Sequence, residues 1–200
     1  MRVPTRQRAE AYLADAERAN PGPWAAHSRH TARAAEAIAR AHPSLDPDAA
    51  AVLGLLHDIG RGRGVSDFRH VLDGYRLLAA DGFDGAARIC LTHSFPRPDL
   101  NGYAGEFDAP EEDVRFVAAF LADRPFDDYD RLIQLCDGLC LPTGFCLMEK
   151  RLVDVALRHG YTPAALETWR ERFAIKARIE QAIGGSIYRL LDGVVANTFA

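Results

Sequence analysis

The sequence contains no apolar stretch of about 18 residues, the length that a helix needs to cross a membrane. Polar, helix-like sequence follows Met1, where a signal peptide would carry its apolar core. The four cysteines are too sparse for the disulfide framework of a small secreted protein, so we expect reduced thiols. Together these absences predict a cytoplasmic protein with neither a signal peptide nor a membrane span.

The sequence also lacks the long blocks of lysine and arginine that bind nucleic-acid backbones, and its net charge is -4. We therefore expect no nucleic-acid polymer among its partners. Hydrophobic residues make up 48% of the chain and charged residues 26%, a balance typical of folded proteins rather than disordered ones. A chain of 200 residues is long enough for one domain with a substantial hydrophobic core.

Nearly every long segment shows helical rather than alternating spacing of its apolar residues. Asp46 and Pro47 are typical of a helix start. The irregular segment from Ser94 to Pro110 is a loop of the length that often carries function. We predict one all-α domain, with helices at residues 6–19, 24–41, from about 46 onward, 67–81, 85–93, 111–121, 129–141, 145–159 and 163–183.

An adjacent histidine and aspartate, His57 and Asp58, end an apolar run at residues 49–56. Ionisable side chains are costly to remove from water unless they are paired or bind a metal, so this pair indicates an organised site. Gly60, Gly62 and Gly64 follow directly, which predicts that the helix ends there and that a loop opens toward a substrate.

Further histidines and aspartates lie in or beside predicted helices, where helical bundles place their metal ligands. Asp137 is, like Asp58, a carboxylate on an otherwise apolar helix. Imidazole and carboxylate ligands together suit Zn, Fe, Mn, Co or Ni. Since a single histidine on a helix is more often a surface or hydrogen-bonded residue, His30, His42 and His159 are interpreted in that way. The candidate metal ligands are His27, His57, Asp58, His70, His93 and Asp137.

The order His27, then His57-Asp58, then Asp137 resembles the HD superfamily of metal-dependent phosphohydrolases, which are all-α proteins. The local sequences agree: WAAHS stands at residues 24–28 and LLHDIG at residues 55–60. The resemblance covers about residues 27–137. It implies a single HD-domain helical bundle over residues 1–200, with a core at about 24–141 on which the N- and C-terminal helices pack.

The resemblance also implies that His27, His57, Asp58 and Asp137 hold the principal metal ion. His70 and His93 match the two extra histidines of the binuclear branches, in which the aspartate at the position of Asp58 bridges both ions. We therefore expect two divalent transition-metal ions. In the alternative interpretation, His70 and His93 line the pocket and bind substrate phosphate.

Such a site is expected to hydrolyse a phosphate ester or anhydride of a nucleotide or another small phosphorylated metabolite. Two cations would lower the pKa of a bridging water to give hydroxide, with Asp58 and Arg61 as catalytic residues. Arg61 and Arg63, directly after the His-Asp pair, are placed to neutralise developing charge. Further candidates for substrate binding are Arg97, in the loop at 94–110 with Tyr103, and Lys150 with its neighbour Arg151.

Two other functions stay open at this point. One branch of the superfamily uses a di-iron centre to oxygenate small molecules, with a tyrosine and a glutamate shortly before its first histidine. Here that stretch reads NPGPW at residues 20–24, a poor match. The third possibility is a nucleotide-binding sensor without turnover.

Overall fold

Two of the helices at the candidate site begin where an aspartate side chain caps free backbone N–H groups. The Asp46 carboxylate accepts a hydrogen bond from the N–H of Ala49 at 2.7 Å and starts helix α3 (Pro47–Leu56). Asp127 and Asp130 form a reciprocal capping box at the start of helix α7 (Asp128–Asp137). These local signals fix the first residues of α3 and α7, the helices that end at or next to His57-Asp58 and Asp137.

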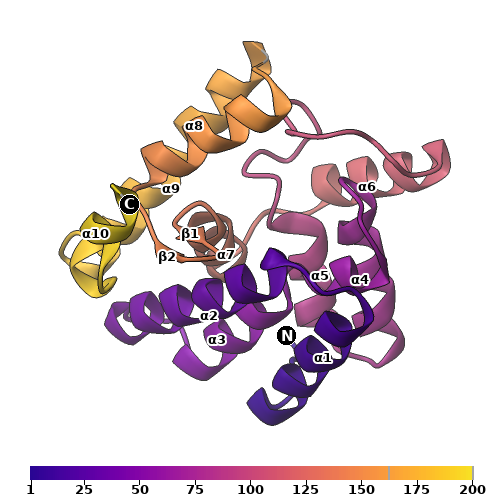
Figure 1. The fold of residues 1–200 in the computed structure, drawn as a ribbon, viewed down its shortest axis with the longest axis horizontal. Helices are drawn as coiled ribbons and strands as arrows, with labels where there is room; N and C mark the ends of the chain where they lie inside the picture. The colour runs from indigo at the N-terminus through magenta and orange to yellow at the C-terminus, as the bar shows by residue number, and fades with distance from the viewer. Residues whose placement is uncertain (162, 200) are drawn as a thin grey trace.

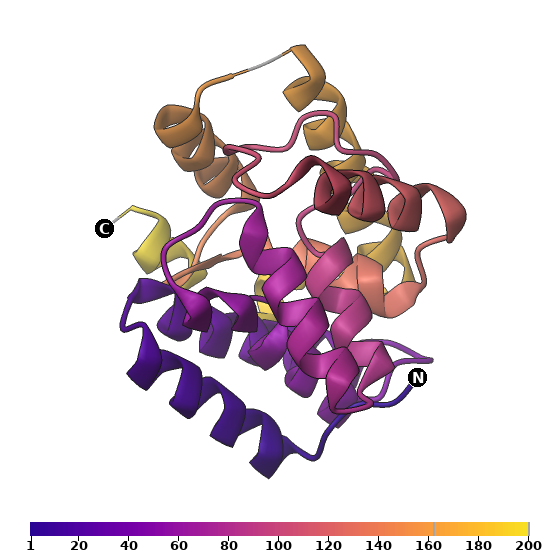
Figure 2. The same ribbon diagram turned by 90° about the vertical axis from the view of Figure 1, so that its right-hand side faces the viewer.

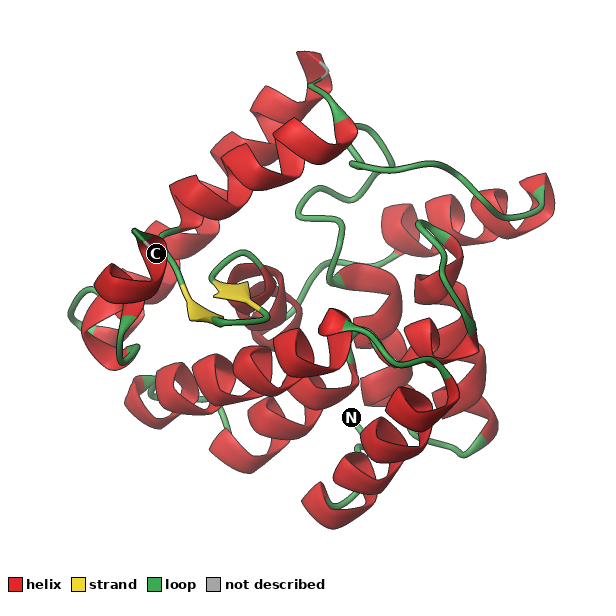
Figure 3. Cartoon of the chain, viewed as in Figure 1, coloured by secondary structure: helices red, strands yellow, loops and turns green. Residues whose placement is uncertain are grey.

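The computed structural model describes residues 1–161 and 163–199, and about 68% of these residues are helical. The all-α prediction is confirmed (Figure 3). None of the helices in the described residues combines the length and apolarity needed to cross a membrane. The remaining α-helices are α1 (Arg6–Ala19), α2 (Pro23–Ala41), α4 (Arg69–Ala80), α5 (Asp84–Thr92), α6 (Glu111–Asp123), α8 (Met148–His159), α9 (Pro163–Ile183) and α10 (Val194–Thr198), and the 3-10 helices are η1 (Ile59–Arg63) and η2 (Ile187–Leu190).

The segment after Asp137 differs from the sequence prediction, which extended two helices through it. Two short antiparallel strands, β1 (Cys140–Leu141) and β2 (Gly144–Phe145), form a hairpin in which Cys140 pairs with Phe145. Pro142 stands in the turn, and Gly144 has a φ of 144°, a conformation that favours glycine. The predicted helices at 129–141 and 145–159 are therefore shorter than expected, ending at Asp137 and beginning at Met148.

Helices α2 and α3 lie side by side, α5 packs against α3 and α4, and the hairpin packs on α2 (Figure 1). Gly54 makes the closest part of the α2–α3 packing possible, because a Cβ atom there would lie 2.6 Å from the Cα of Ala32. In the two views, α8 rises to one end of the molecule and α9 returns from it toward α7 (Figures 1 and 2). The four cysteines are free and buried, as expected for reduced thiols.

A second close approach joins η1 to α4. A Cβ atom on Gly60 would lie 2.0 Å from the carbonyl oxygen of His70 and 2.5 Å from the backbone nitrogen of Gly74. Glycine is therefore required at position 60 for the chain after Asp58 to pack directly on the first turns of α4. This contact sets the position of His70 relative to Asp58.

We predict that Gly60→Ala destabilises the protein by about 1–3 kcal/mol, because the added methyl group meets backbone atoms that have no room to move. Thermal unfolding followed by circular dichroism should show a melting temperature several degrees lower. Gly185→Ala is the control, since a Cβ atom there meets nothing within 4 Å. Equal melting temperatures for the two variants would contradict the packing described for η1 and α4.

Candidate metal centre

Each of the four candidate histidines has its Nδ1 atom beside backbone carbonyl oxygens. A carbonyl only accepts hydrogen bonds, so each Nδ1 carries the hydrogen and donates it. The Nε2 lone pairs therefore face the interior, which is the arrangement that metal-binding histidines adopt. The partners are the carbonyl oxygens of Cys140 for His27 at 3.2 Å, Gly54 for His57 at 2.8 Å, Asp67 for His70, and Ile89 and Cys90 for His93 at 3.2 and 3.1 Å. The Nε2 atom of His93 also has the Ser94 hydroxyl at 2.9 Å.

The Nε2 atoms meet in two pairs. Those of His27 and His57 are 3.3 Å apart, and those of His70 and His93 are 3.4 Å apart. With both hydrogens on the Nδ1 atoms, each pair brings two lone pairs together, a repulsive arrangement that a cation between or beside them would turn into an attractive one. Each pair therefore supplies two of the nitrogen ligands that a metal site needs.

Asp58 lies between the two histidine pairs and is only 5% exposed. Its Oδ1 atom is 3.1 Å from Nε2 of His70 and 3.5 Å from Nε2 of His93, while Oδ2 is 3.8 Å from Nε2 of His57. Oδ1 is buried and has no hydrogen-bond partner in the part of the chain that the structure describes. Leaving such an oxygen without a donor is costly, so this atom fits a metal ion.

Two buried triads, each with its ligand atoms within 4.8 Å of one another, therefore share Asp58. One consists of His27, His57 and Asp58, and the other of Asp58, His70 and His93. This arrangement is consistent with a binuclear metal site.

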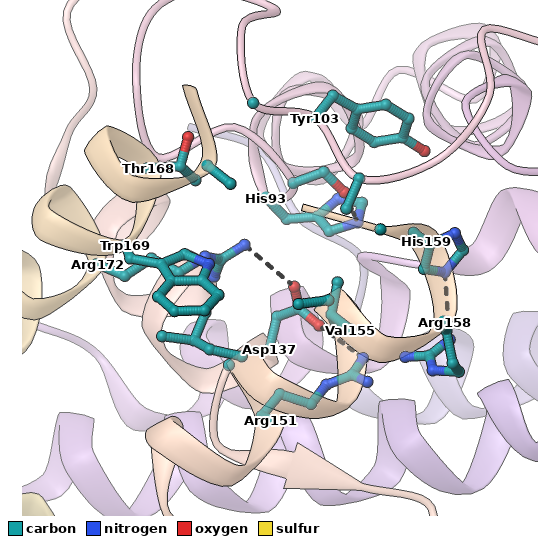
Figure 4. Close-up of a pocket in the computed structure, with 18 of the residues that line it drawn as sticks. His93, Tyr103, Asp137, Arg151, Val155, Arg158, His159, Thr168, Trp169 and Arg172 are labelled. Carbon is teal, nitrogen blue, oxygen red and sulfur yellow. Dashed lines mark hydrogen bonds and ion pairs between the residues drawn. The ribbon is translucent and has the colours of Figure 1, made fainter. Parts of the chain in front are cut away.

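Asp137 joins the first triad from the C-terminal end of α7. Its Oδ1 atom is 3.1 Å from Nε2 of His27. Its two oxygens also face two guanidinium groups, Arg151 at 4.0 Å and Arg172 at 3.9 Å (Figure 4). All six residues put forward as metal ligands from the sequence are thus brought together by helices α2, α4, α5 and α7 and by the end of α3.

The electrostatic environment holds these residues in the forms that bind metals. Burial opposes ionisation of Asp58, yet Arg61 and the nearby imidazoles hold the pKa of its carboxyl well below the usual range. Burial likewise opposes ionisation of Asp137, but its pKa is also well below the usual range because of His27 and the two arginines. Burial lowers the pKa of His57 to about 3, so its imidazole is neutral at neutral pH.

Arg61 reaches the site from η1, as its sequence position suggested. Its Nε atom donates to Oδ2 of Asp58 at 2.8 Å, and its Nη1 atom donates to the carbonyl oxygen of Ser66 at 3.1 Å. These two bonds fix the plane of the guanidinium group. Burial lowers the pKa of Arg61, but the adjacent Asp58 carboxylate more than offsets this effect, so the pKa is raised and the group stays charged.

Two cavities meet at Asp58 and Arg61. The inner cavity has a volume of about 170 Å³ and lies between the metal centre, α8 and α9. The outer cavity has a volume of about 570 Å³ and opens toward Trp24 and the turn of the hairpin. Both cavities are also lined by Arg151, Arg158 and Tyr103.

The loop at 94–110 is fixed above these cavities by aromatic packing and by hydrogen bonds to the start of α4. The Tyr103 ring packs against Phe68 and Phe95, with ring centroids 5.7 and 5.4 Å away. The backbone N–H of Glu106 donates to the Asp67 carboxylate at 3.0 Å. Because the carbonyl oxygen of Asp67 also orients His70, the loop and the metal centre share one support.

Three residues predicted to bind substrate are not among the described residues that line either cavity. Arg63 is exposed, and Arg97 is paired with Asp99 at 3.0 Å. Lys150 is outside the lining because its neighbour Arg151 takes the inward position on α8. Arg172 is not predicted from the sequence, since its segment of α9 is rich in charges of both signs, as an ordinary exposed helix face is.

We predict that Asp58→Asn weakens metal binding by more than roughly tenfold, because the variant removes the charge that both triads share. Elemental analysis after dialysis, together with metal titration of the stripped protein, measures the effect. Asp48→Asn is the control: it removes a carboxylate from the first turn of α3, the helix that ends just before His57, and this carboxylate is 84% exposed. Retention of metal by Asp58→Asn at the level of the control would refute the assignment of Asp58.

Comparison with known families agrees with this geometry. The HD domain family matches residues 24–140, more than half of the chain, and the matched segment contains all six candidate ligands. Searches among curated proteins and among solved structures found no match. On the strength of the family match, this chain belongs to the HD domain family.

Proposed function

We propose that this protein is a metal-dependent phosphohydrolase that cleaves a phosphate ester or anhydride of a nucleotide or another small phosphorylated metabolite. The observation that carries the proposal is the pair of buried triads sharing Asp58, with charged arginines directly beside them. Membership of the HD domain family supports the same class of reaction.

In this proposal, the first ion is held by His27, His57, Asp58 and Asp137, and the second by Asp58, His70 and His93. Bound divalent ions supply a water of lowered pKa and neutralise phosphate oxygens. The Asp58 carboxylate contributes one oxygen to each triad, because Oδ1 faces His70 and His93 while Oδ2 faces His57. Its role is to hold both halves of the centre at a fixed separation.

Arg61 is the residue that we expect to contact the substrate phosphate beside the metal centre. Its hydrogen bonds to Asp58 and Ser66 orient the guanidinium group before any substrate arrives. A planar guanidinium group binds two phosphate oxygens at once, and a fixed group loses little entropy when charge develops on them. Arg61 therefore acts as a preorganised electrostatic partner of the reacting phosphate.

The two cavities suit a small phosphorylated molecule. Arginines line the inner cavity beside the candidate ligands, and guanidinium groups are common partners of phosphate. The outer cavity, at about 570 Å³, lies within the size range of pockets that hold small molecules, roughly 300–1,000 Å³. Trp24, Pro21 and Leu141 in its lining provide apolar surface for the organic part of such a substrate.

The proposal is tested by loading the purified protein with single divalent metals and assaying a panel of nucleotides and phosphorylated metabolites for phosphate release. Metal-dependent release from at least one compound is expected. His57→Ala and Asp58→Ala should abolish metal retention and activity together, because His57 belongs to the first triad and Asp58 to both. Normal metal content and turnover in both variants would disprove the site.

The same preparations distinguish the two other functions. Iron-dependent oxygen consumption without phosphate release would replace the hydrolase proposal with the oxygenase. Tight nucleotide binding by the metal-loaded protein, with no turnover on any compound, would replace it with the sensor.

For Arg61→Lys we predict a fall in kcat of roughly ten- to hundredfold with unchanged metal content. Lysine keeps the charge but loses the flat group that bonds Asp58 and Ser66 simultaneously. Steady-state kinetics and elemental analysis measure the two effects. The same change at the exposed neighbour Arg63 should leave kcat near the wild-type value, and an equal loss at both positions would contradict the role given to Arg61.

A further inference from the structure

Two cations reach the candidate metal centre from outside the segment that matches the HD domain family. Arg151 lies on α8 and Arg172 on α9, both beyond residue 140. They stand on either side of Asp137 and line the inner cavity (Figure 4). The family match therefore says nothing about what these residues bind.

Arg172 is a buried cation whose hydrogen-bonding capacity is largely unused. Its side chain is 12% exposed, and burial lowers its pKa. Among the described residues, its one hydrogen bond runs from Nη1 to the carbonyl oxygen of Gln134 at 2.7 Å. The nearest carboxylate oxygen, on Asp137, is 3.9 Å from Nη2, beyond hydrogen-bond distance. A guanidinium group has five N–H donors, so Arg172 has donors left for an anion in the inner cavity.

Arg151 faces Asp137 from the other side. Its Nη2 atom is 4.0 Å from Oδ1 of Asp137, and its Nη1 atom donates to Asp154 at 3.3 Å. Arg151 lines both cavities, whereas Arg172 lines the inner one alone. The guanidinium groups of Arg151 and Arg172 thus make the inner cavity a favourable place for an anion.

The sizes of the cavities differ in a way that bears on the substrate. The inner cavity holds about 170 Å³, and that space already borders His70, His93 and Asp137. It is the smaller of the two cavities, and the guanidinium groups of Arg151 and Arg172 make it the end of the site suited to a phosphate group. The outer cavity, at about 570 Å³, lies within the size range of pockets that hold small molecules, so it suits the organic part, and it begins at the same Asp58 and Arg61.

We infer that the substrate carries its phosphate at one end. The terminal phosphate lies in the inner cavity between Arg151 and Arg172, and the organic part extends into the outer cavity. This inference rests on the proposed hydrolase function and narrows its substrate class to phosphomonoesters and terminal phosphates, excluding internal diesters with an organic group on both sides. Water adds its oxygen to phosphorus, the bond from phosphorus to the leaving oxygen breaks, and a proton of that water ends on the leaving oxygen.

The inference is tested first by binding, without any turnover. Isothermal titration of the metal-loaded full-length protein uses inorganic phosphate and dimethyl phosphate as probes. We expect inorganic phosphate to bind at least roughly tenfold more tightly than dimethyl phosphate, because only the former presents three free oxygens to the arginines. Arg172→Gln should weaken binding of inorganic phosphate by roughly ten- to hundredfold, the range for losing a hydrogen bond to a charged group, with metal content unchanged.

Arg170→Gln is the matched control, since Arg170 lies on the same helix with an exposed side chain paired to Glu167. Should Arg172→Gln fail to fold, Arg151→Gln tests the other half of the phosphate site from a less buried position. Unchanged phosphate affinity in the folded variants, or equal affinity for the two probes, would overturn the inference.

Hydrolysis then separates this inference from the proposed function. We expect the wild-type protein to cleave p-nitrophenyl phosphate in preference to bis(p-nitrophenyl) phosphate, and Arg172→Gln to lose the preference. Faster cleavage of the diester would overturn the inference while leaving the hydrolase function intact. Binding of phosphate with no hydrolysis of any compound would instead contradict the proposed function.

Discussion

The charge of Asp58 is the constraint on which the centre of this protein depends. An ionised carboxylate that is 5% exposed must be stabilised by its surroundings, and its two oxygens are stabilised differently. Oδ2 accepts a hydrogen bond from Arg61, whereas Oδ1 has only imidazole Nε2 atoms nearby. Two close backbone approaches make this geometry possible: Gly54 brings α3 onto α2, and Gly60 brings the following turn onto α4. The helix packing is thus coupled directly to the chemistry of one side chain.

Three of the four histidines are oriented by a hydrogen bond to a backbone carbonyl nearby in the sequence, and the fourth is oriented by a distant one. His57, His70 and His93 each face a carbonyl oxygen three residues earlier in the chain. His57 and His93 directly follow the last residues of α3 and α5, where the final carbonyl groups lack partners within the helix. His27 instead depends on Cys140, 113 residues away, so the short hairpin after α7 is needed to orient it.

This difference explains what the sequence could and could not predict. Most helix positions follow from local patterns, although η2 and α10 were not predicted. The six candidate ligands follow from the order of histidines and aspartates that resembles the HD superfamily. Each strand of the hairpin at 140–145 has two residues, too few to show a periodicity, so the sequence predicts the turn between them but assigns residues 140, 141 and 145 to the flanking helices. Arg172 was missed for another reason: only tertiary packing removes it from water, and its neighbours Arg170 and Glu171 stay at or near the surface. Arg61 and Arg63 are likewise equivalent in sequence, and only the structure shows that Arg61 points into the site while Arg63 is exposed.

The charges of the site influence the order in which metal ions and phosphate bind. The described residues that line the inner cavity include four arginines, Arg61, Arg151, Arg158 and Arg172, but only two carboxylates, Asp58 and Asp137. Asp154 pairs with Arg151 and Arg158 from α8, and the lining still carries an excess of positive charge. Cations bound by Asp58 and Asp137 would increase this excess and weaken the hold of Asp137 on its two arginines. An anion would then be attracted more strongly than before, while in the metal-free centre the carboxylates compete for the same guanidinium groups. Phosphate affinity should therefore depend on prior metal binding, and by reciprocity phosphate should tighten the hold on the metal.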